Sequence, residues 1–166
     1  MKAPAFFTRI LSWLTGSRLT VDNSVVRELD LDRFLGSWYE VARFDHFFER
    51  GMSQTKANYV LRDDGNIDVI NTGIKNGKPK TAKGKAKLTD IPSLLRVSFF
   101  GPFYSDYRVM LVDADYRYML IGRGSDGYLW ILSRTPQLAD TDRTTILSEA
   151  KRRGYDTDKL IWVKQN

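Results

Sequence analysis

The residues best placed to interact specifically in this sequence are one tryptophan and one arginine that lie far apart in the chain. Trp38 follows Gly36 at the start of the first strong strand-like run, and Arg134 ends the last such run. A guanidinium stacked on an indole face contributes about 0.5–2 kcal/mol, depending on desolvation. If the strands between them form a barrel, this pair fills one end of it and leaves the other end open.

Catalytic and metal-binding chemistry finds little support in the residue types. The single histidine, His46, has no Ser/Asp constellation near it, and the absence of cysteine excludes a thiol nucleophile or a zinc–thiolate site in this sequence. The carboxylates lie mainly in turns such as Asp63-Asp64. Glu40 is expected inside the barrel, in a salt bridge or hydrogen bond near the floor, with proton transfer as the alternative. We therefore expect neither an enzyme nor a cofactor.

Composition indicates one folded domain with a basic surface. The 166 residues are 42% hydrophobic and 13% aromatic, which suffices for one sizeable core. The net charge of +6 favours anionic partners such as phospholipid headgroups or nucleic acid, and of these we expect no nucleic acid. One lysine-rich run has two interpretations: a solvated outer face of a strand, or a positively charged face that attracts anionic lipid. The run comprises Lys75, Lys78, Lys80, Lys83, Lys85 and Lys87.

The N-terminal segment, residues 1–23, differs from the rest. Its apolar residues, Phe6 to Leu14, fall on one side of a helical wheel, and the segment is too short to span a bilayer. An interfacial membrane anchor, a weak export signal and a packing helix are the three interpretations. The second unit, residues 24–166, is predicted to be the barrel domain.

From residue 29 onward, turn signals separate short strand-like runs, a pattern typical of an all-β protein. Asn76-Gly77 is a strong hairpin signal, and a helix follows the last main strand, beginning near Asp140 and ending at Gly154. Eight strands with short connections predict an antiparallel up-and-down β-barrel with one C-terminal helix packed outside, a size that can hold one small ligand. The predicted strands are residues 38–44, 55–61, 67–75, 80–88, 94–100, 107–113, 118–122 and 128–133.

Strand alternation predicts which side chains face the lumen. If Trp38 points inward, Glu40 and Ala42 on the same strand point inward as well. On a later strand, Leu111 should face inward together with the residues two and four positions before it. Ala82, Gly84 and Ala86 would leave one interior wall nearly bare. Ligand contact is predicted for Trp130, Phe99, Tyr107, Val97, Val109, Tyr118 and Ala42, and for Phe47, Phe48 and Phe103 in the loops of the open end. A barrel packed solid by its own aromatic side chains is the alternative.

The motifs together resemble the lipocalin family, in particular its bacterial outer-membrane branch, which is related to apolipoprotein D and the plant temperature-induced lipocalins. Gly36-x-Trp38 resembles the first family motif, Asp113-x-x-Tyr116 the second and Arg134 the third, over residues 29–165. These five residues are expected to build the barrel floor. Two stretches resemble the bacterial branch specifically, residues 42–51 and 97–104.

The resemblance implies a lipid-binding protein without enzymatic activity. It would hold the acyl chain of a fatty acid or lysophospholipid in the barrel, for lipid storage or transport in membrane maintenance, as a homodimer in the cell envelope. Bacterial relatives are tethered through a cysteine, which this sequence lacks. Either residues 1–20 replace that tether as a peripheral anchor at the outer membrane, or the protein is soluble in the periplasm or the cytoplasm; the cell envelope is the predicted location. The rival functions are a membrane- or partner-binding protein with a filled barrel and a carrier of another small hydrophobic molecule.

Overall fold

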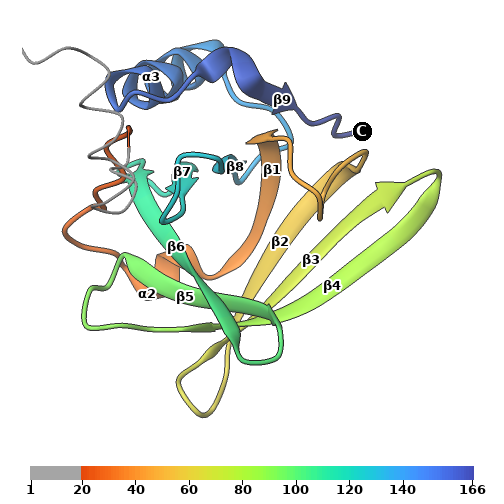
Figure 1. Ribbon diagram of the computed structural model, residues 1–166, viewed down its shortest axis with the longest axis vertical. Coiled ribbons are helices and arrows are strands. Elements are labelled where there is room, and N and C mark those ends of the chain that lie inside the picture. The colour runs from red at the N-terminus through yellow and green to blue at the C-terminus, as the bar shows by residue number, and fades with distance from the viewer. Residues whose placement is uncertain (1–19) are drawn as a thin grey trace, which may run out of the picture.

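Residues 20–166, which the computed structural model describes, fold around one closed antiparallel barrel (Figure 1). Consecutive strands pair from β2 to β8, and β1 closes the ring by pairing with both β8 and β2. The predicted eight-stranded barrel is confirmed. Its strands are β1 (Gly36–Phe44), β2 (Ser53–Leu61), β3 (Ile67–Lys75), β4 (Lys78–Lys87), β5 (Leu94–Phe100), β6 (Phe103–Val112), β7 (Tyr118–Gly122) and β8 (Leu129–Ser133).

The connection between β3 and β4 is the two-residue hairpin that the sequence predicts. Asn76 and Gly77 both have positive φ, at 53° and 74°. Paired positive φ angles characterise the turn whose twist matches that of antiparallel strands. The hairpin therefore keeps β3 and β4 in register along their whole length, from Lys75 opposite Lys78 to Ile67 opposite Ala86.

A short helix, α2 (Leu31–Phe34), lies under one end of the barrel (Figure 1). The Asp30 carboxylate caps it by accepting a hydrogen bond from the Arg33 backbone N–H, 3.3 Å away. The side chain of Phe34, at the end of this helix, is fully buried in the inner core. The helix therefore supplies an apolar plug for the end of the barrel where β1 begins.

The longer helix, α3 (Asp140–Arg152), packs on the outside of the wall (Figure 1). Asp140 is its first helical residue rather than its cap, since Ala139 holds the cap position. Ile146 and Ala150 are buried against a second core cluster formed by the outward side chains of β1, β7 and β8. A short 3₁₀ turn, η1 (Thr157–Lys159), then leads into β9 (Leu160–Trp162), which pairs with the upper part of β1.

Two β-bulges reverse the alternation predicted from the sequence. The register of β1 against β8 shifts between Glu40 and Ala42, and that of β6 against β7 shifts between Val109 and Leu111. Each shift admits one unpaired residue, so the side chains beyond it change faces. The prediction that Ala42 faces the lumen is therefore wrong: Ala42 packs in the outer cluster under α3, as does Leu111.

The seam between β1 and β2 is closed by the C-terminal tail. β1 pairs with β2 only over Gly36–Tyr39 and with β9 over Ala42–Phe44. The Gln165 side-chain amide donates to the Glu40 carbonyl at 2.7 Å and to the Thr55 carbonyl at 2.9 Å, one on each side of the seam. The tail therefore satisfies backbone groups that the diverging strands leave unpaired.

Candidate functional site

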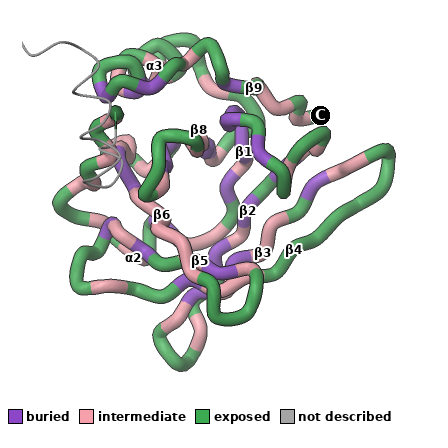
Figure 2. Tube along the Cα trace, in the orientation of Figure 1, coloured by how far each residue is buried: buried purple, intermediate pink, exposed green. Residues whose placement is uncertain are grey.

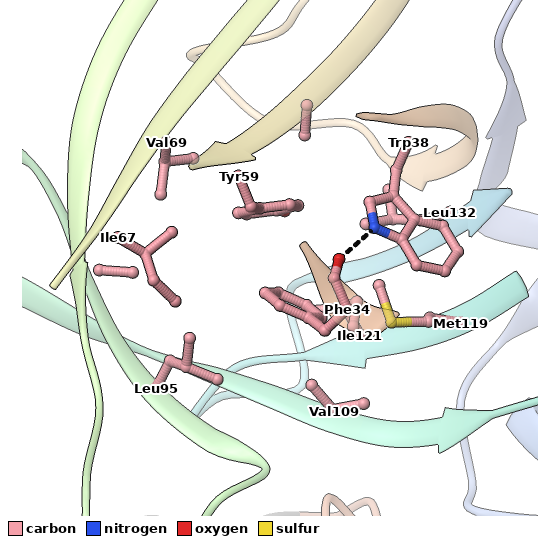
Figure 3. Close-up of a cluster of buried hydrophobic side chains, with 12 residues drawn as sticks. Phe34, Trp38, Tyr59, Ile67, Val69, Leu95, Val109, Met119, Ile121 and Leu132 are labelled. Atoms are coloured by element: carbon pink, nitrogen blue, oxygen red, sulfur yellow. Dashed lines mark hydrogen bonds between the residues drawn. The ribbon is translucent and has the colours of Figure 1, made fainter. Parts of the chain in front are cut away.

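The floor of the barrel is sealed by Trp38, which lies in the buried cluster of Figure 3, and by Arg134, which stacks on it. The Trp38 indole is fully buried and donates to the Phe34 carbonyl at 2.7 Å. The Arg134 guanidinium lies 3.7 Å from the centre of the indole ring and donates to the carbonyls of Ser37 at 2.8 Å and Leu35 at 2.9 Å. This end therefore excludes ligand.

The other predicted floor residues support this arrangement. Gly36 has φ of 93°, and a side-chain Cβ there would lie 3.4 Å from an Arg134 nitrogen. Tyr116 also has positive φ, and its hydroxyl accepts from the Asp30 backbone N–H at 2.7 Å. Asp113 accepts from the Arg117 side chain at 2.8 Å. These contacts hold the loop between β6 and β7 against the segment that carries α2.

Above the floor, the lumen narrows at a pair of tyrosines. The hydroxyls of Tyr59 on β2 and Tyr107 on β6 are 2.8 Å apart, and the rings meet edge to face. Burial raises the pKa of both phenols, so both stay neutral. Apolar side chains of the inner core surround Tyr59 in Figure 3, and Tyr107 packs against the same core. The bonded pair therefore spans the barrel interior between β2 and β6.

A buried polar network crosses the upper lumen. Because of the bulge in β1, Arg43 rather than Ala42 faces inward, opposite Trp130. The Arg43 guanidinium donates to Glu40 at 2.9 Å and to the backbone carbonyl of Glu49 at 2.7 Å. The Glu49 carboxylate accepts from the Trp130 indole at 3.2 Å and lies 2.9 Å from His46 Nε2. The loop of residues 45–52 is therefore fastened to the barrel wall.

The two carboxyl groups of this network have opposite protonation preferences. Burial raises the pKa of Glu40 well above its ordinary value, and the neighbouring Glu49 charge adds to this effect. Burial also opposes ionisation of Glu49, but hydrogen bonds from His46 and Glu40 outweigh it and lower the Glu49 pKa to about 2. One negative charge, mainly on Glu49, therefore faces the buried Arg43 cation.

The upper lumen is lined by aromatic and aliphatic side chains that keep contact with solvent. Val97, Phe99, Tyr107 and Trp130 pack against the inner core yet are only partly buried, whereas Val109 below them is fully buried. Since these residues stand on the inside of a closed wall, their exposure marks the open end of the lumen. Tyr118 does not join them, because it lies in the outer cluster under α3.

The bare wall predicted on β4 is only partly open. A Cβ on Gly84 would lie 2.8 Å from the Phe99 ring, so that ring occupies the space that the glycine leaves. Beyond it, Ala82 is exposed, because β4 pairs with β5 only over Lys85–Lys87 (Figure 2). The wall therefore splays apart beside Phe99 and widens the open end on that side.

Four phenylalanines stand at the rim of the open end. Phe47, Phe48, Phe100 and Phe103 are between 56% and 80% exposed. The Phe48 ring lies 5.6 Å from Phe47 and 5.5 Å from Phe100, so three of the rings form one patch. Exposed apolar side chains gathered in this way mark an interaction surface rather than ordinary surface composition.

Two hollows on the outside of the wall are separate from this lumen. One of about 530 Å³ is lined by Lys87, Arg96 and residues 102–104. The other, of about 570 Å³, lies at the turn between β2 and β3, around Arg62 and Asp64. Both are open, and neither is lined by the inward residues named above. We place the candidate site in the upper lumen because partly exposed aromatic side chains face inward there.

Sequence patterns did not identify four polar and aromatic residues of the upper lumen. Arg43 was missed because of the bulge, and Glu49 lies in a loop where alternation gives no direction. Tyr128 stacks on Trp130 with ring centres 5.7 Å apart, and Arg123 lies over Tyr128. The sequence did carry one signal for Tyr128. It lies two residues before Trp130, so strand alternation places both side chains on the same face.

A closed barrel with a sealed floor, an aromatic upper lumen and an open end defines the class of proteins that bind small hydrophobic ligands. The lipocalin-like domain family model matches residues 29–165, and the chain belongs to the lipocalin family. Members of this family are in general binding and transport proteins.

The relatives of this chain include bacterial outer membrane lipoproteins. The outer membrane lipoprotein Blc of Citrobacter freundii is 50% identical over 86% of this chain and 82% of its own length. Blc of Vibrio cholerae is 42% identical over 97% of this chain and 98% of its own length. Temperature-induced lipocalin-1 of Arabidopsis thaliana is 38% identical over 86% and 82%.

A solved structure supports the fold alone. Insecticyanin from Manduca sexta superposes with a TM-score of 0.70 at 20% identity, covering 86% of this chain and 84% of that one. No helix among residues 20–166 has the length and apolar character needed to cross a membrane.

Proposed function

We propose that this protein binds a fatty acid or lysophospholipid, with the acyl chain in the upper lumen, and serves lipid storage or transport in membrane maintenance. The observation that carries the proposal is the partly exposed wall of Val97, Phe99, Tyr107 and Trp130 above a sealed floor. Each buried methylene contributes about 0.8 kcal/mol, so contact with these apolar side chains favours the binding of an acyl chain.

Of the other predicted contacts, Val109 lies deepest, below the partly exposed residues, and would meet the end of the chain only if the tyrosine pair moved. Phe47, Phe48 and Phe103 stand outside the lumen and would meet the headgroup end. Ala42 and Tyr118 are not part of this proposal, because both face outward.

The test uses delipidated protein and a fluorescent fatty acid. Trp130→Ala is expected to weaken uptake about tenfold, because it removes a large apolar surface from the lumen. Trp162→Ala is the matched control, since Trp162 lies on β9 outside the barrel and stacks with Arg143. Absence of uptake by the wild type, with no acyl ligand in its native mass spectrum, would refute the proposal.

Membrane contact is a second candidate function, favoured by the phenylalanine rim. Aromatic side chains insert at the lipid interface, and the exposed lysines of β4 add attraction to anionic headgroups. Salt-sensitive co-sedimentation with anionic vesicles is expected if the rim docks. Binding to vesicles without uptake of any acyl ligand would favour this function over lipid transport.

Assembly, location and lack of catalysis are also proposals. We expect a homodimer, tested by light scattering at micromolar concentration, and no turnover of lipid esters. We also expect the protein to act in the cell envelope, because relatives that are 42–50% identical to it are outer membrane lipoproteins. Cell fractionation tests this, and recovery only from the cytoplasm would contradict it.

A further inference from the structure

The upper lumen contains two arginines in very different surroundings. Arg43 is almost fully buried, and its two terminal nitrogens donate to Glu40, to the Glu49 carbonyl and to the Met52 carbonyl. Those contacts fasten the loop of residues 45–52. Arg43 therefore has a structural task and no terminal nitrogen to offer a ligand.

Arg123 follows β7 at the open end and is only half-buried. One of its terminal nitrogens donates to the Ser105 hydroxyl. Ser105 pairs with Val97, whose side chain faces the lumen, so the hydroxyl lies on the inner side of the wall. The Arg123 guanidinium is therefore at the mouth of the lumen.

The charge of Arg123 is unpaired within the described part of the chain. Among residues 20–166, no carboxylate lies within ion-pair distance of it, whereas Arg96 and Arg108 nearby both pair with Asp106. A guanidinium carries five N–H donors, and within the same residues only the contact with Ser105 uses one. Most of the N–H donors of the Arg123 guanidinium are therefore available to a ligand.

Aromatic stacking holds this guanidinium in place. Its central carbon lies 4.2 Å from the centre of the Tyr128 ring, and Tyr128 stacks on Trp130 with an interplanar angle of 24°. His46 flanks both rings, at 5.6 Å and 5.5 Å between centres. Arg123 therefore lies at the outer end of a stack of aromatic rings. Trp130, at the inner end of this stack, lines the lumen.

We propose that Arg123 and the Ser105 hydroxyl form the binding site for the anionic oxygens of the ligand's head, a carboxylate or a phosphate. This inference rests on the proposed function, because it assumes that an acyl chain lies along Trp130. The planar fork of a guanidinium matches the paired oxygens of both groups. The Trp130 indole N–H already donates a hydrogen bond to Glu49, so it is not a second donor for the anionic head of the ligand.

The test compares ligands that share one chain and differ in the head. Calorimetric titration of delipidated protein would use palmitate, palmitoyl lysophosphatidate and the uncharged monopalmitoylglycerol, each kept below its micellar concentration. Arg123→Gln is expected to weaken binding of the two anions by about ten- to hundredfold and to leave monopalmitoylglycerol unchanged. A larger loss for one anion identifies carboxylate or phosphate as the preferred head.

Arg50→Gln is the matched control, because Arg50 lies at the same end but pairs with Asp45 at 3.0 Å. It should leave all three affinities unchanged. Ser105→Ala and Arg123→Lys keep the test valid if Arg123→Gln fails to fold, since both should weaken anion binding selectively. Equal losses for charged and uncharged ligands, or no loss for either, would overturn the inference. Failure of the wild type to bind any of the three would instead refute the proposed function.

Discussion

The carboxyl pair of the upper lumen makes a quantitative prediction about stability. Only one negative charge faces Arg43, whose side chain is 2% exposed. Hydrogen bonds from His46 and Glu40 lower the pKa of Glu49, so its ionised form stabilises the folded protein. If Glu49 is neutralised, Glu40 loses the neighbouring charge that opposes its ionisation and can take over the pairing with Arg43, 2.9 Å away.

A double-mutant cycle tests this sharing of charge. Glu49→Gln should cost about 1–2 kcal/mol at pH 7, because Glu40 compensates in part, and Glu40→Gln should change stability by less than about 1 kcal/mol. The double variant leaves Arg43 buried without an anion, which costs roughly 3–5 kcal/mol. The coupling between the two sites is therefore about 2 kcal/mol, measured by urea unfolding followed through tryptophan fluorescence.

The control cycle combines Glu40→Gln with Glu28→Gln, an exposed acid, and should be additive. The pH dependence gives a second readout. Because the Glu49 pKa is lowered, its contribution is present above pH 4.5 and is lost as the pH falls toward 2, so Glu49→Gln should flatten this part of the stability curve. Additivity of Glu40→Gln and Glu49→Gln within about 0.5 kcal/mol would refute the shared charge.

Three further substitutions test the framework by thermal and urea unfolding. Arg134→Gln removes the stack on Trp38 and its carbonyl contacts, and should cost about 2–3 kcal/mol; a loss below about 0.5 kcal/mol would contradict the role of the floor. Gly84→Ala places a Cβ 2.6 Å from the Ser98 carbonyl oxygen and should cost about 1–3 kcal/mol, so a neutral result would argue against that close approach. Gln165→Ala should cost about 1 kcal/mol by leaving the seam carbonyls unpaired, and unchanged stability would show that water replaces the amide.

The barrel could be predicted from the sequence because its signals are local. Alternation with a period of two identifies strands, and Asn76-Gly77 specifies a hairpin within four residues. The floor was predictable for a related reason: Gly36, Trp38 and Arg134 occur at the ends of strands that a closed barrel must bring together.

The composition of the site was less predictable because it depends on a one-residue irregularity. β1 changes partner from β2 to β9 near Val41, and the bulge at that point turns Ala42 out and Arg43 in. Periodicity alone carries no sign of an inserted residue. The role of Glu49 could not be predicted from the sequence either, because its partner Trp130 is 81 residues away and the contact exists only in the folded chain.

Quenching of Trp130 by an acyl chain tests the central claim most directly. Titration of delipidated protein with a brominated fatty acid should quench tryptophan fluorescence with a stoichiometry of about one, because bromine quenches an indole only near contact. With Trp13→Phe introduced into both proteins, the bound fatty acid should quench little in Trp130→Phe, since Trp38 lies sealed in the floor and Trp162 on the outside. Equal quenching in the two proteins, or none in the wild type, would show that the chain does not lie in the upper lumen.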